Sequence, residues 1–371
     1  MTKLEQLIQD LCPNGVKMVK LGDVAKISRG VVLSKSYIAD NAGEYPVYSS
    51  QTENNGCLGY INTYAYDGDF ITWTTDGANA GTVFYRTGKF SITNVCGLIK
   101  IENPNICLKF IYYVLSVSAQ KYVNRGMGNA KLMSNVMAEI QIPLPPLAVQ
   151  SEIVRLLDKF TLYMSELAAE LAARCKQYEH YRDQLLTFDD TVKRVKLGEV
   201  AENLDYKRKP ITASQRVSGE YPYYGASGIV DYVEGYIFDG DYLLISEDGA
   251  NLVARNSPIA FSIHGKNWVN NHAHVLKFEH RCTRKYVEYY INSISVEPYI
   301  LAGAQPKLNQ AQLNNILIPL PPLSEQERIV SILDRFDKLC HDIREGLPAE
   351  IELRQKQYEH YRDRLLSFER E

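Results

Sequence analysis

Lys176-Gln-Tyr-Glu-His-Tyr-Arg-Asp183 and Lys356-Gln-Tyr-Glu-His-Tyr-Arg-Asp363 are the same eight residues, repeated without a change in one chain. Each octad lies near the end of a stretch in which apolar side chains recur at helical spacing. Packing between helices would keep only every third or fourth residue alike in two copies. Here the outward positions match too, which indicates that both octads meet the same kind of partner.

Five further matches run through the chain in the same order. They are Lys20-Leu-Gly-Asp-Val-Ala25 with Lys196-Leu-Gly-Glu-Val-Ala201, Gly43-Glu-Tyr-Pro46 with Gly219-Glu-Tyr-Pro222, Asp67-Gly-Asp69 with Asp239-Gly-Asp241, Asp76-Gly-Ala-Asn79 with Asp248-Gly-Ala-Asn251, and Ile142-Pro-Leu-Pro-Pro-Leu147 with Ile318-Pro-Leu-Pro-Pro-Leu323. The two members of each match lie nearly half the chain apart, which is far too long a period for a solenoid repeat. The pattern therefore indicates a tandem duplication of a whole domain together with its appendage.

The domain part of each copy has the composition of an α+β fold. Residues 18–145 and 194–321 are rich in Gly, Tyr, Thr, Val and Asn. Runs such as Phe70-Ile-Thr-Trp-Thr74 have strand character and are bounded by Asp-Gly turn signals, and short helical patterns such as 109–118 also occur. The Pro-Leu-Pro-Pro run then predicts an extended exit, because a residue that precedes proline avoids the helical region.

The appendage of each copy is predicted to be a long helix with a heptad stripe of apolar residues. The first stripe is Ile153, Leu157, Phe160, Met164, Leu167, Leu171, Tyr178, Tyr181, Leu185 and Phe188. The second is Ile329, Leu333, Phe336, Cys340, Ile343, Leu347, Ile351, Tyr358, Tyr361, Leu365 and Phe368. The second copy holds four more residues than the first, which predicts about one added turn, with a kink or a restart at Gly346 and Pro348.

Two such helices, each about 60 Å long at ~1.5 Å per residue, need a surface that buries their stripes. We expect them to pack antiparallel, so that each helix leaves one domain and reaches the other, with pseudo-two-fold symmetry and the two termini close together. The alternative is that each helix folds back on its own domain. The predicted fold class is α+β, with domains at 1–146 and 190–322 and long helices at 147–189 and 323–371.

Composition limits the classes of function. The net charge of −3, from 41 Lys and Arg against 44 Asp and Glu, argues weakly against a DNA-binding protein, whose phosphate contacts need cations. No stretch approaches the ~20 apolar residues of a membrane span, and residues 1–15 lack a signal-peptide core. We therefore expect a cytoplasmic protein with no membrane contact. Seven scattered cysteines without a C-x₂₋₄-C spacing predict reduced thiols and no zinc site.

Motifs of enzymes are missing from the sequence. It has no G-x-x-x-x-G-K-[ST] loop, no G-x-G-x-x-G, no H-E-x-x-H, no Asn-Pro-Pro-Tyr-type run and no Glu-x-Lys pair. We predict no catalytic residue, no cofactor and no metal. His272 and His274 share a strand face, as metal ligands do, but no clear third ligand is near them in sequence, so a structural role is favoured. Asp76-Gly-Ala-Asn79 and Asp248-Gly-Ala-Asn251 are explained equally by turns and by loops that face a ligand.

The succession of these features resembles a known family. The domain, the Pro-Leu-Pro-Pro-Leu run, a helix start of the type Gln150-Ser-Glu-Ile-Val154 and the octad, followed by a second round of all four, is similar to the specificity (S) subunit of type I restriction–modification systems. The residues that fit the two helix starts are Gln150, Ile153, Leu157, Asp158 and Phe160, and Gln326, Ile329, Leu333, Asp334 and Phe336. The resemblance covers the chain apart from its first ~15 residues.

The resemblance implies a division of labour with partner subunits. Two target-recognition domains would each read one half of a bipartite site in double-stranded DNA, and the helices would act as a ruler for the unread spacer. Two methyltransferase (M) subunits, which carry S-adenosylmethionine and adenine-N6 chemistry, would bind the scaffold, and restriction (R) subunits would join them. Two other hypotheses stay open: a stand-alone methyltransferase or nuclease, and a coiled-coil scaffold that binds proteins without DNA.

Candidate contact residues follow from chemistry. Arg and Lys can reach guanine or phosphate, Asn and Gln can read adenine, and Glu247 can accept from cytosine, although each can equally be a solvated loop residue. The candidates for DNA are Arg29, Lys35, Ser50, Gln51, Thr75, Asn79 and Lys131 in the first domain, and Lys207, Arg208, Lys209, Ser227, Glu247, Asn251 and Lys307 in the second. The candidates for partner binding are Tyr178, Glu179, Arg182, Tyr358, Glu359 and Arg362.

Overall fold

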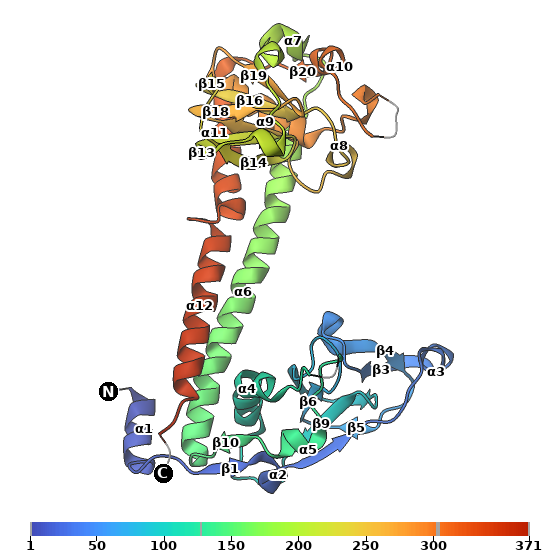
Figure 1. Cartoon of the computed structure of the whole chain (residues 1–371), viewed down its shortest axis with the longest axis vertical. Coiled ribbons are helices and arrows are strands. Elements are labelled where there is room, and N and C mark those ends of the chain that lie inside the picture. The colour runs from blue at the N-terminus through green and yellow to red at the C-terminus, as the bar shows by residue number, and fades with distance from the viewer. Residues whose placement is uncertain (1, 127, 302–304, 370–371) are drawn as a thin grey trace. The chain divides into compact units, whose positions relative to one another are not determined.

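The structure, a computed structural model, describes residues 2–126, 128–301 and 305–369 (Figure 1). The chain divides into two compact units, which we call unit 1 (residues 1–166 and 352–371) and unit 2 (residues 167–351). The long helix α6 (Leu147–Leu186) contributes its first half to unit 1 and its second half to unit 2.

Unit 1 contains two four-stranded sheets, with strand orders β2-β9-β6-β7 and β4-β3-β8-β5, and a two-stranded sheet β1-β10. Its strands are β1 (Met18–Lys20), β2 (Lys26–Arg29), β3 (Ala42–Tyr48), β4 (Cys57–Ile61), β5 (Tyr66–Asp67), β6 (Phe70–Thr74), β7 (Val83–Arg86), β8 (Lys89–Ile92), β9 (Cys96–Lys100) and β10 (Gln141–Pro143). Its helices besides α6 are α1 (Lys3–Leu11), α2 (Leu21–Val24), α3 (Lys35–Asp40), α4 (Leu108–Ser118) and α5 (Ser134–Ala138), with 3₁₀ turns η1 (Glu53–Gly56) and η2 (Ala119–Tyr122).

Unit 2 repeats this arrangement, with sheets β12-β19-β16-β17, β14-β13-β18-β15 and β11-β20. Its strands are β11 (Arg194–Lys196), β12 (Glu202–Asn203), β13 (Ser218–Gly225), β14 (Gly228–Val233), β15 (Phe238–Asp239), β16 (Tyr242–Ser246), β17 (Ala260–Ile263), β18 (Lys266–Val269), β19 (Ala273–Lys277) and β20 (Leu317–Pro319). The helices are α7 (Leu197–Val200), α8 (Asn251–Ala254), α9 (Arg281–Ser293), α10 (Gln310–Asn314) and α11 (Leu323–His341), with η3 (Asp205–Lys207), η4 (Ala213–Gln215) and η5 (Glu297–Tyr299). The last helix, α12 (Leu347–Leu365), starts in unit 2 and continues in unit 1. The predicted duplication of an α+β domain is confirmed.

The central strand β6 is buried along its whole length because both of its faces are covered. Ile71 and Trp73 belong to the core that includes Phe110 of α4, and Phe70 belongs to a second core that includes Phe90 of β8. This is the period-two alternation of a strand. In unit 2 the strand β16 is divided in the same way, because Leu243 and Ile245 share one core and Leu244 lies in the other.

The Pro-Leu-Pro-Pro runs close each domain onto its own first strand. β10 pairs with β1 in unit 1, and β20 pairs with β11 in unit 2. A buried glutamine then fixes the start of the long helix. Gln150 donates to the Pro145 carbonyl at 2.7 Å and accepts from the Cys107 amide at 2.8 Å, and Gln326 donates to the Pro321 carbonyl at 2.8 Å. A side chain that pairs the polar groups of a buried turn explains why both helix starts carry this residue.

The long helices pack antiparallel, as predicted. In unit 1, Phe160 of α6 stacks on Tyr361 of α12, with ring centroids 5.7 Å apart. In unit 2 the same two residue types exchange helices, and Tyr181 of α6 lies on Phe336 of α11 at 5.6 Å. The last residue of α12, Leu365, and the following Leu366 and Phe368 also join the core of unit 1. The second helix therefore returns to the first domain, and the alternative of helices that fold back on their own domains is wrong.

In both units, the segment that follows a long helix bonds to the segment that precedes the first strand of a domain, and the hydrogen bond is the same. In unit 2 the Val192 amide donates to the Asp189 carbonyl at 3.4 Å across a short covalent turn. In unit 1 the Val16 amide donates to the Glu369 carbonyl at 2.9 Å, although these residues lie near opposite ends of the sequence. The predicted proximity of the two ends is confirmed.

The extra residues of the second copy do not lengthen its helix. α11 ends at His341 and α12 begins at Leu347, so a restart is confirmed, with Pro348 in its first turn. Residues 342–346 form a loop, in which the Gly346 amide donates to the Asp342 carbonyl at 2.9 Å. A Cβ at Gly346 would lie 2.5 Å from the Lys338 carbonyl, so the loop closes tightly over the end of α11. The predicted added turn is wrong, and so is the place of Ile343 in the stripe, because that side chain is 76% exposed.

Candidate nucleic-acid interface

In each unit a loop is fastened against the end of the central strand, and we call it the anchored loop (residues 124–126 and 128–132 in unit 1, and 301 and 305–308 in unit 2). The backbone of Lys131 forms isolated antiparallel β-bridges with Asn124 and Asp76. The backbone of Lys307 forms the equivalent β-bridges with Leu301 and Asp248. The next amide in each loop donates to the residue that follows the strand, Leu132 to the Thr75 carbonyl at 2.9 Å and Leu308 to the Glu247 carbonyl at 2.8 Å. The backbone frame is therefore the same in both units.

The polar side chains on this frame form a small cluster in unit 1. Arg29, at the end of β2, donates to the Thr75 hydroxyl at 2.8 Å and pairs with Asp76 at 3.3 Å. Lys131 approaches the other oxygen of Asp76 at 3.7 Å. Asn79, in the same turn, donates to the Thr52 hydroxyl at 2.9 Å. The structure thus brings together the predicted residues Arg29, Thr75 and Lys131, and leaves the two cations partly open to solvent.

Unit 2 carries a denser and more buried cluster in the same place. Arg208 contacts Glu247 at 2.6 Å and Asp205 at 3.3 Å, and Lys307 reaches Glu247 at 3.1 Å. Arg208 and Glu247 are only 13% and 11% exposed. His274, 1% exposed, lies beneath them, with Nδ1 2.6 Å from Asp205. The predicted residues Arg208, Glu247 and Lys307 therefore lie together. Arg208 and Glu247 form an ion pair with each other, and of the three side chains only that of Lys307 is half exposed.

The electrostatics of this cluster keep both carboxylates ionised. Burial raises the pKa of Asp205, but His274, the Val275 amide and Arg208 outweigh it and hold the pKa below its ordinary value. Burial likewise raises the pKa of Glu247, and Arg208, His274 and Lys307 lower it below the ordinary value. Paired and hydrogen-bonded carboxylates of this kind stay charged despite burial.

Asp205, Glu247 and His274 also satisfy the spacing of a metal site, because one ligand atom of each lies within 4.8 Å of the others. Sequence spacing alone does not place these two carboxylates near His274. However, the guanidinium of Arg208 already bridges both carboxylates, and Lys307 neutralises Glu247 further. The arrangement fits an internal ion network better than a cation site. His272 lies apart and bonds Asp248 at 2.9 Å.

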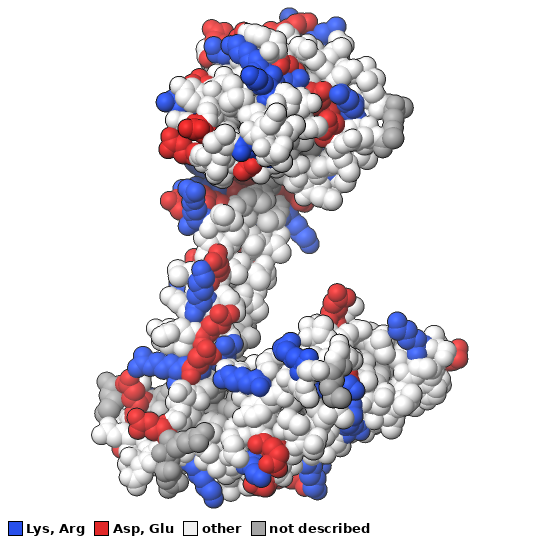
Figure 2. Space-filling view, in the orientation of Figure 1, with Lys and Arg blue, Asp and Glu red and all other residues white. Residues whose placement is uncertain are grey.

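The other predicted DNA residues are spread over neighbouring loops. Lys35 starts α3 and is exposed, and Ser50 and Gln51 follow β3, with Gln51 bonded to the Cys57 carbonyl. In unit 2, Lys207 and Lys209 flank Arg208, Ser227 is exposed between β13 and β14, and Asn251 holds its own turn through Ser257 at 2.9 Å. Lys and Arg are interspersed with Asp and Glu on the visible face of each unit (Figure 2). Any phosphate contact on that face therefore depends on a few placed cations.

Sequence reasoning missed Asp205, and it treated Asp76 only as part of a turn that could face a ligand and His274 only as a structural residue or metal ligand. The signal that could have found the anchored loops was present. Arg125-Gly-Met-Gly-Asn-Ala-Lys131 and Leu301-Ala-Gly-Ala-Gln-Pro-Lys307 are glycine-containing runs that end in a lysine at matching positions of the two copies. The cations at the two strand ends were harder to align, because Arg29 and Arg208 differ in offset, and Asp205 takes the position that corresponds to Arg29.

The octads place their residues alike in both units. Arg182 lies over the ring of Tyr178 at 5.9 Å and bonds Asp183 at 2.8 Å, and Arg362 repeats both contacts with Tyr358 and Asp363 at 5.6 and 2.8 Å. Both tyrosines are partly buried in the helix packing, with Tyr178 against His341. Glu179 and Glu359 are exposed. Each octad thus presents acidic residues outward from a fixed Tyr–Arg–Asp group.

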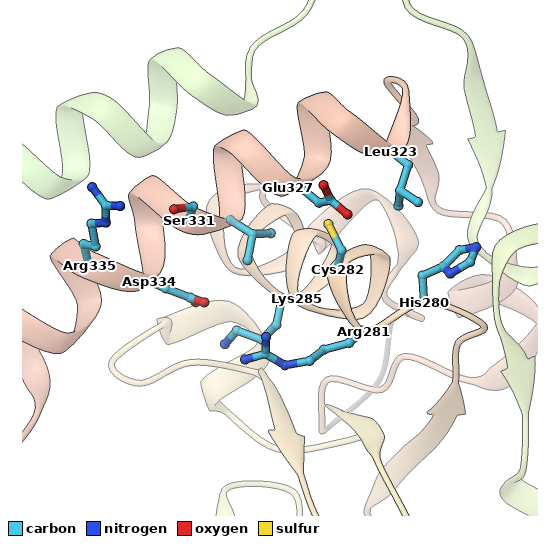
Figure 3. A pocket seen from close by; sticks show the side chains of 10 residues that line it. His280, Arg281, Cys282, Lys285, Leu323, Glu327, Ser331, Asp334 and Arg335 are labelled. Carbon is cyan, nitrogen blue, oxygen red and sulfur yellow. The ribbon is translucent and has the colours of Figure 1, made fainter.

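A groove of about 620 Å³ lies in unit 2 between α9 and α11. Its labelled side chains come from both helices, with Arg281 and Lys285 on one side and Glu327 and Asp334 on the other (Figure 3). Asp334 accepts from the Tyr289 hydroxyl at 2.6 Å, and its counterpart Asp158 in unit 1 accepts from Tyr113 at 2.5 Å. These paired bonds join the α+β part of each unit to its long helix.

Relatives were found by comparison with known proteins. A family model described as type I restriction modification DNA specificity domain matches residues 13–176 and again residues 189–353. A putative type I specificity subunit of Mycoplasma pneumoniae is 32% identical over 365 residues, covering 95% of this chain and 98% of the relative. A putative type I restriction enzyme specificity subunit of Haemophilus influenzae is 32% identical over 408 residues, covering 99% and 98%.

Solved structures share the fold. The S subunit of a type I restriction–modification system from M. genitalium has a TM-score of 0.60 at 17% identity, with 95% of this chain and 97% of that chain covered. A chain from a study of complex assembly in a type I system has a TM-score of 0.57 at 14% identity, with 95% and 98% covered. Fold and duplication define a tandem protein of two recognition-type domains joined by paired helices. The chain belongs to the family of type I restriction–modification DNA specificity proteins. None of its helices, within the residues that the structure describes, has the length and hydropathy to cross a membrane.

Proposed function

We propose that this chain reads both halves of a bipartite DNA site through its two anchored loops and the strand ends beneath them. The observation that carries the proposal is the contrast between frame and side chains. The backbone bonds of Leu132 and Leu308 are the same, whereas the groups around them are Arg29, Thr75 and Asp76 in unit 1 and a buried ion network in unit 2. A constant frame with different polar groups is what two unlike half-sites require.

Within this proposal the four segments have separate tasks. Residues 1–146 and 190–322 are the two target-recognition domains, and residues 147–189 and 323–371 are the helices that set the spacer. Lys131 and Lys307 supply exposed cations at the loops, and the remaining predicted residues of each domain line the same DNA. Arg208 and Glu247 act mainly by holding the surface in place, since each already neutralises the other.

The reaction itself is proposed to reside in partner subunits. Two methyltransferase subunits dock at the octads, restriction subunits join that core, and the chain needs neither catalytic residue nor cofactor of its own. A relative is named the specificity subunit of a type I restriction enzyme, and a structural neighbour comes from a study of complex assembly in such a system. Both names support this assignment, and a protein of this kind works in the cytoplasm, where the DNA is.

A domain exchange tests the proposal. The full chain is produced with its methyltransferase subunit, and modified adenines are mapped across a genome, before and after residues 194–321 are replaced by the equivalent domain of another family member. We expect a bipartite motif of which one half changes and the other half and the spacer stay the same. If the complex modifies no defined motif, or if both halves change together, the two-reader proposal fails. A chain that binds its partners but gives no salt-sensitive DNA shift would be a protein scaffold instead.

A further inference from the structure

Besides its backbone hydrogen bonds, each anchored loop is bonded by one buried side chain, and the two side chains differ. The indole Nε1 of Trp73 donates to the Leu132 carbonyl at 3.0 Å. The imidazole Nε2 of His274 lies 2.7 Å from the Leu308 carbonyl. Leu132 and Leu308 are equivalent positions of the duplication, since each follows the lysine of its loop, and all four residues are at most 1% exposed. Each unit therefore satisfies the same buried carbonyl with a side chain.

The donors come from different strands of the same ladder. Trp73 on β6 is paired with Gly97 on β9, and Ile245 on β16 is paired with His274 on β19. These are the same rung, because both lie one residue before the end of the central strand. A Cβ at Gly97 would lie 2.2 Å from the Trp73 ring, so the large side chain of unit 1 requires glycine opposite it. The bulky donor has changed strands between the two copies, yet the bond to the loop is present in both.

Retention of a bond across such a change points to a requirement of the loop and not of the core. A hydrophobic pair of similar volume would fill the rung equally well. Ile245, the partner of His274, is already such a hydrophobic residue. If a buried carbonyl is left without a donor, the equilibrium constant for the loop in its docked position falls roughly tenfold to a hundredfold. The loop would then move its preceding lysine, Lys131 or Lys307, out of place.

The chemistry of the two anchors is nevertheless different. Trp73 has one donor and no charge. His274 presents its second nitrogen to Asp205 at 2.6 Å, and Glu247 lies 3.8 Å from the same nitrogen. Arg208 contacts both of these carboxylates. A carbonyl oxygen can only accept, so Nε2 donates to Leu308 and Nδ1 faces the Asp205 carboxylate. The anchor of unit 2 thus also fastens the segment that follows β12, where Asp205 lies.

We propose that Trp73 and His274 are positioning residues for specificity, each of which fixes the anchored loop of its own domain so that only one half-site is read correctly. The proposal rests on the proposed function of these loops in DNA reading. Neither side chain is exposed, so neither contacts a base, and both act through the loop. The consequence is local: loss of one anchor should relax one half of the target and leave the other half unchanged.

The experiment uses the full chain in complex with its methyltransferase subunits and a DNA library in which both half-sites vary. Trp73→Phe keeps the aromatic ring and removes only the donor, and His274→Phe removes the donor of unit 2. We expect each variant to lose roughly tenfold of its discrimination, about one hydrogen bond, at the half-site of its own domain only. Ile245→Val is the matched control, because it changes the same rung but removes no hydrogen-bond donor to the loop, and discrimination should be unchanged.

Two further readouts separate positioning from simple damage. Amide exchange at Leu132 should quicken in Trp73→Phe while exchange within β6 does not. The double variant Ile245→Trp, His274→Gly transplants the anchor of unit 1 into unit 2 and should regain discrimination relative to His274→Phe. If folded variants keep full discrimination, or lose it equally at both half-sites, the inference is overturned. If the unaltered complex recognises no bipartite site, the proposed function has failed instead, and the two results cannot be confused.

Discussion

Glu152, at the start of α6, is a carboxylate with 4% of its side chain exposed and two cationic partners. Arg155 bonds it from the next turn at 2.7 Å, and Lys3 reaches it from α1 at 3.0 Å. The hydrogen bonds of Arg155, followed by those of Lys3, outweigh the effect of burial and lower the pKa of Glu152 to about 2. α1 is therefore tied to α6 by a charge as well as by its apolar face.

Glu152 should make the stability of unit 1 depend on pH. Its pKa is lower in the folded chain than the ordinary 4.5, so its contribution is complete above about 4.5 and is lost as the pH falls from there through about 2. Lys3 and Arg155 are 71% and 57% exposed, so solvent weakens both pairs. We expect Glu152→Gln to lower the free energy of unfolding by about 1–2 kcal/mol at neutral pH and by progressively less in acid.

Denaturant unfolding at several pH values measures this effect. Glu325→Gln is a matched control, because Glu325 pairs with Arg328 at 2.7 Å in the same i,i+3 geometry but is 37% exposed. The control should change stability by a few tenths of a kcal/mol at most. Equal losses in the two variants, or a loss at Glu152 that does not shrink in acid, would contradict the assignment.

The candidate site shows where reasoning from single residues stops. Arg29, Thr75 and Lys131 could be selected from the sequence, because cationic and hydroxyl side chains in loops are of the types that bind phosphate or bases. Their common location could not, because it depends on a loop from much further along the chain, which ends at Leu132, folding back onto Thr75. The pairing of Arg208 with Glu247 was hidden for the same reason, and it changes both from candidate readers into supports for each other.

At the scale of elements, the break between α11 and α12 corrects the expected helix lengths. α6 has 40 residues, and α11 and α12 have 19 each, so the two helical paths are nearly equal although the second copy is longer in sequence. The sequence predicted that the second copy has extra residues near Gly346, but not that they form a loop between two helices. A surplus can extend a helix or leave it as a loop, and the choice depends on the partner helix, which fixes how much stripe can be buried.

The loop gives a direct test of whether the helices act as a ruler. Four residues inserted after Leu167 lengthen α6 by about 6 Å at ~1.5 Å per residue. The loop at 342–346 holds enough residues to extend the partner path to match. We expect the preferred DNA spacer to grow by one or two base pairs, at ~3.4 Å per base pair, with both half-sites unchanged. Methylation of a library that varies only in the spacer measures this.

Deletion of four loop residues, 342–345, with α6 left intact is the control. These residues add no rise to either helix, so the optimum spacer should stay where it is. A fixed optimum in an active insertion variant would show that the spacing comes from the domains or from the methyltransferase subunits. A shift in the deletion variant would show that the loop itself sets the spacing.

At the scale of the whole molecule, the duplication was the feature most readily predicted from the sequence. It rests on matching sequence segments, whereas secondary structure must be predicted from weak residue preferences. The octads, the Pro-Leu-Pro-Pro runs and the strand signals predicted two α+β domains and two helices, and the matching sheet orders confirm them. The antiparallel pairing followed from the need to bury two stripes. The sequence did not reveal that equivalent tasks are done by unlike residues, because Trp73 and His274 do not even occupy the same strand.

The octads should dock two copies of one partner. Glu179→Lys, Arg182→Glu, Glu359→Lys and Arg362→Glu together reverse the charges that both octads present. We expect the affinity for methyltransferase subunits to fall at least about tenfold, because like charges then meet across each interface, with the fold retained. Analytical ultracentrifugation of the mixture measures the stoichiometry.

The pair Glu170→Arg, Arg174→Glu provides the control, since it exchanges two charges on the same helix outside the octads. That variant should still bind two methyltransferase subunits. Unchanged binding by the fourfold variant would place the docking surface elsewhere and would leave the identity of the two octads without a functional reason.

The hydrogen bond from Val16 to Glu369 has a consequence for the order in which the two domains can follow each other in the sequence. Val192 makes the same bond to Asp189, and a continuous chain links these two residues. The bond between Val16 and Glu369 forms without such a link, so the geometry of the junction does not require a covalent connection. A circular permutant, opened within residues 189–192 and sealed between Glu369 and Val16, would keep every strand pairing of both units. The strand pairings therefore do not depend on which of the two domains is encoded first.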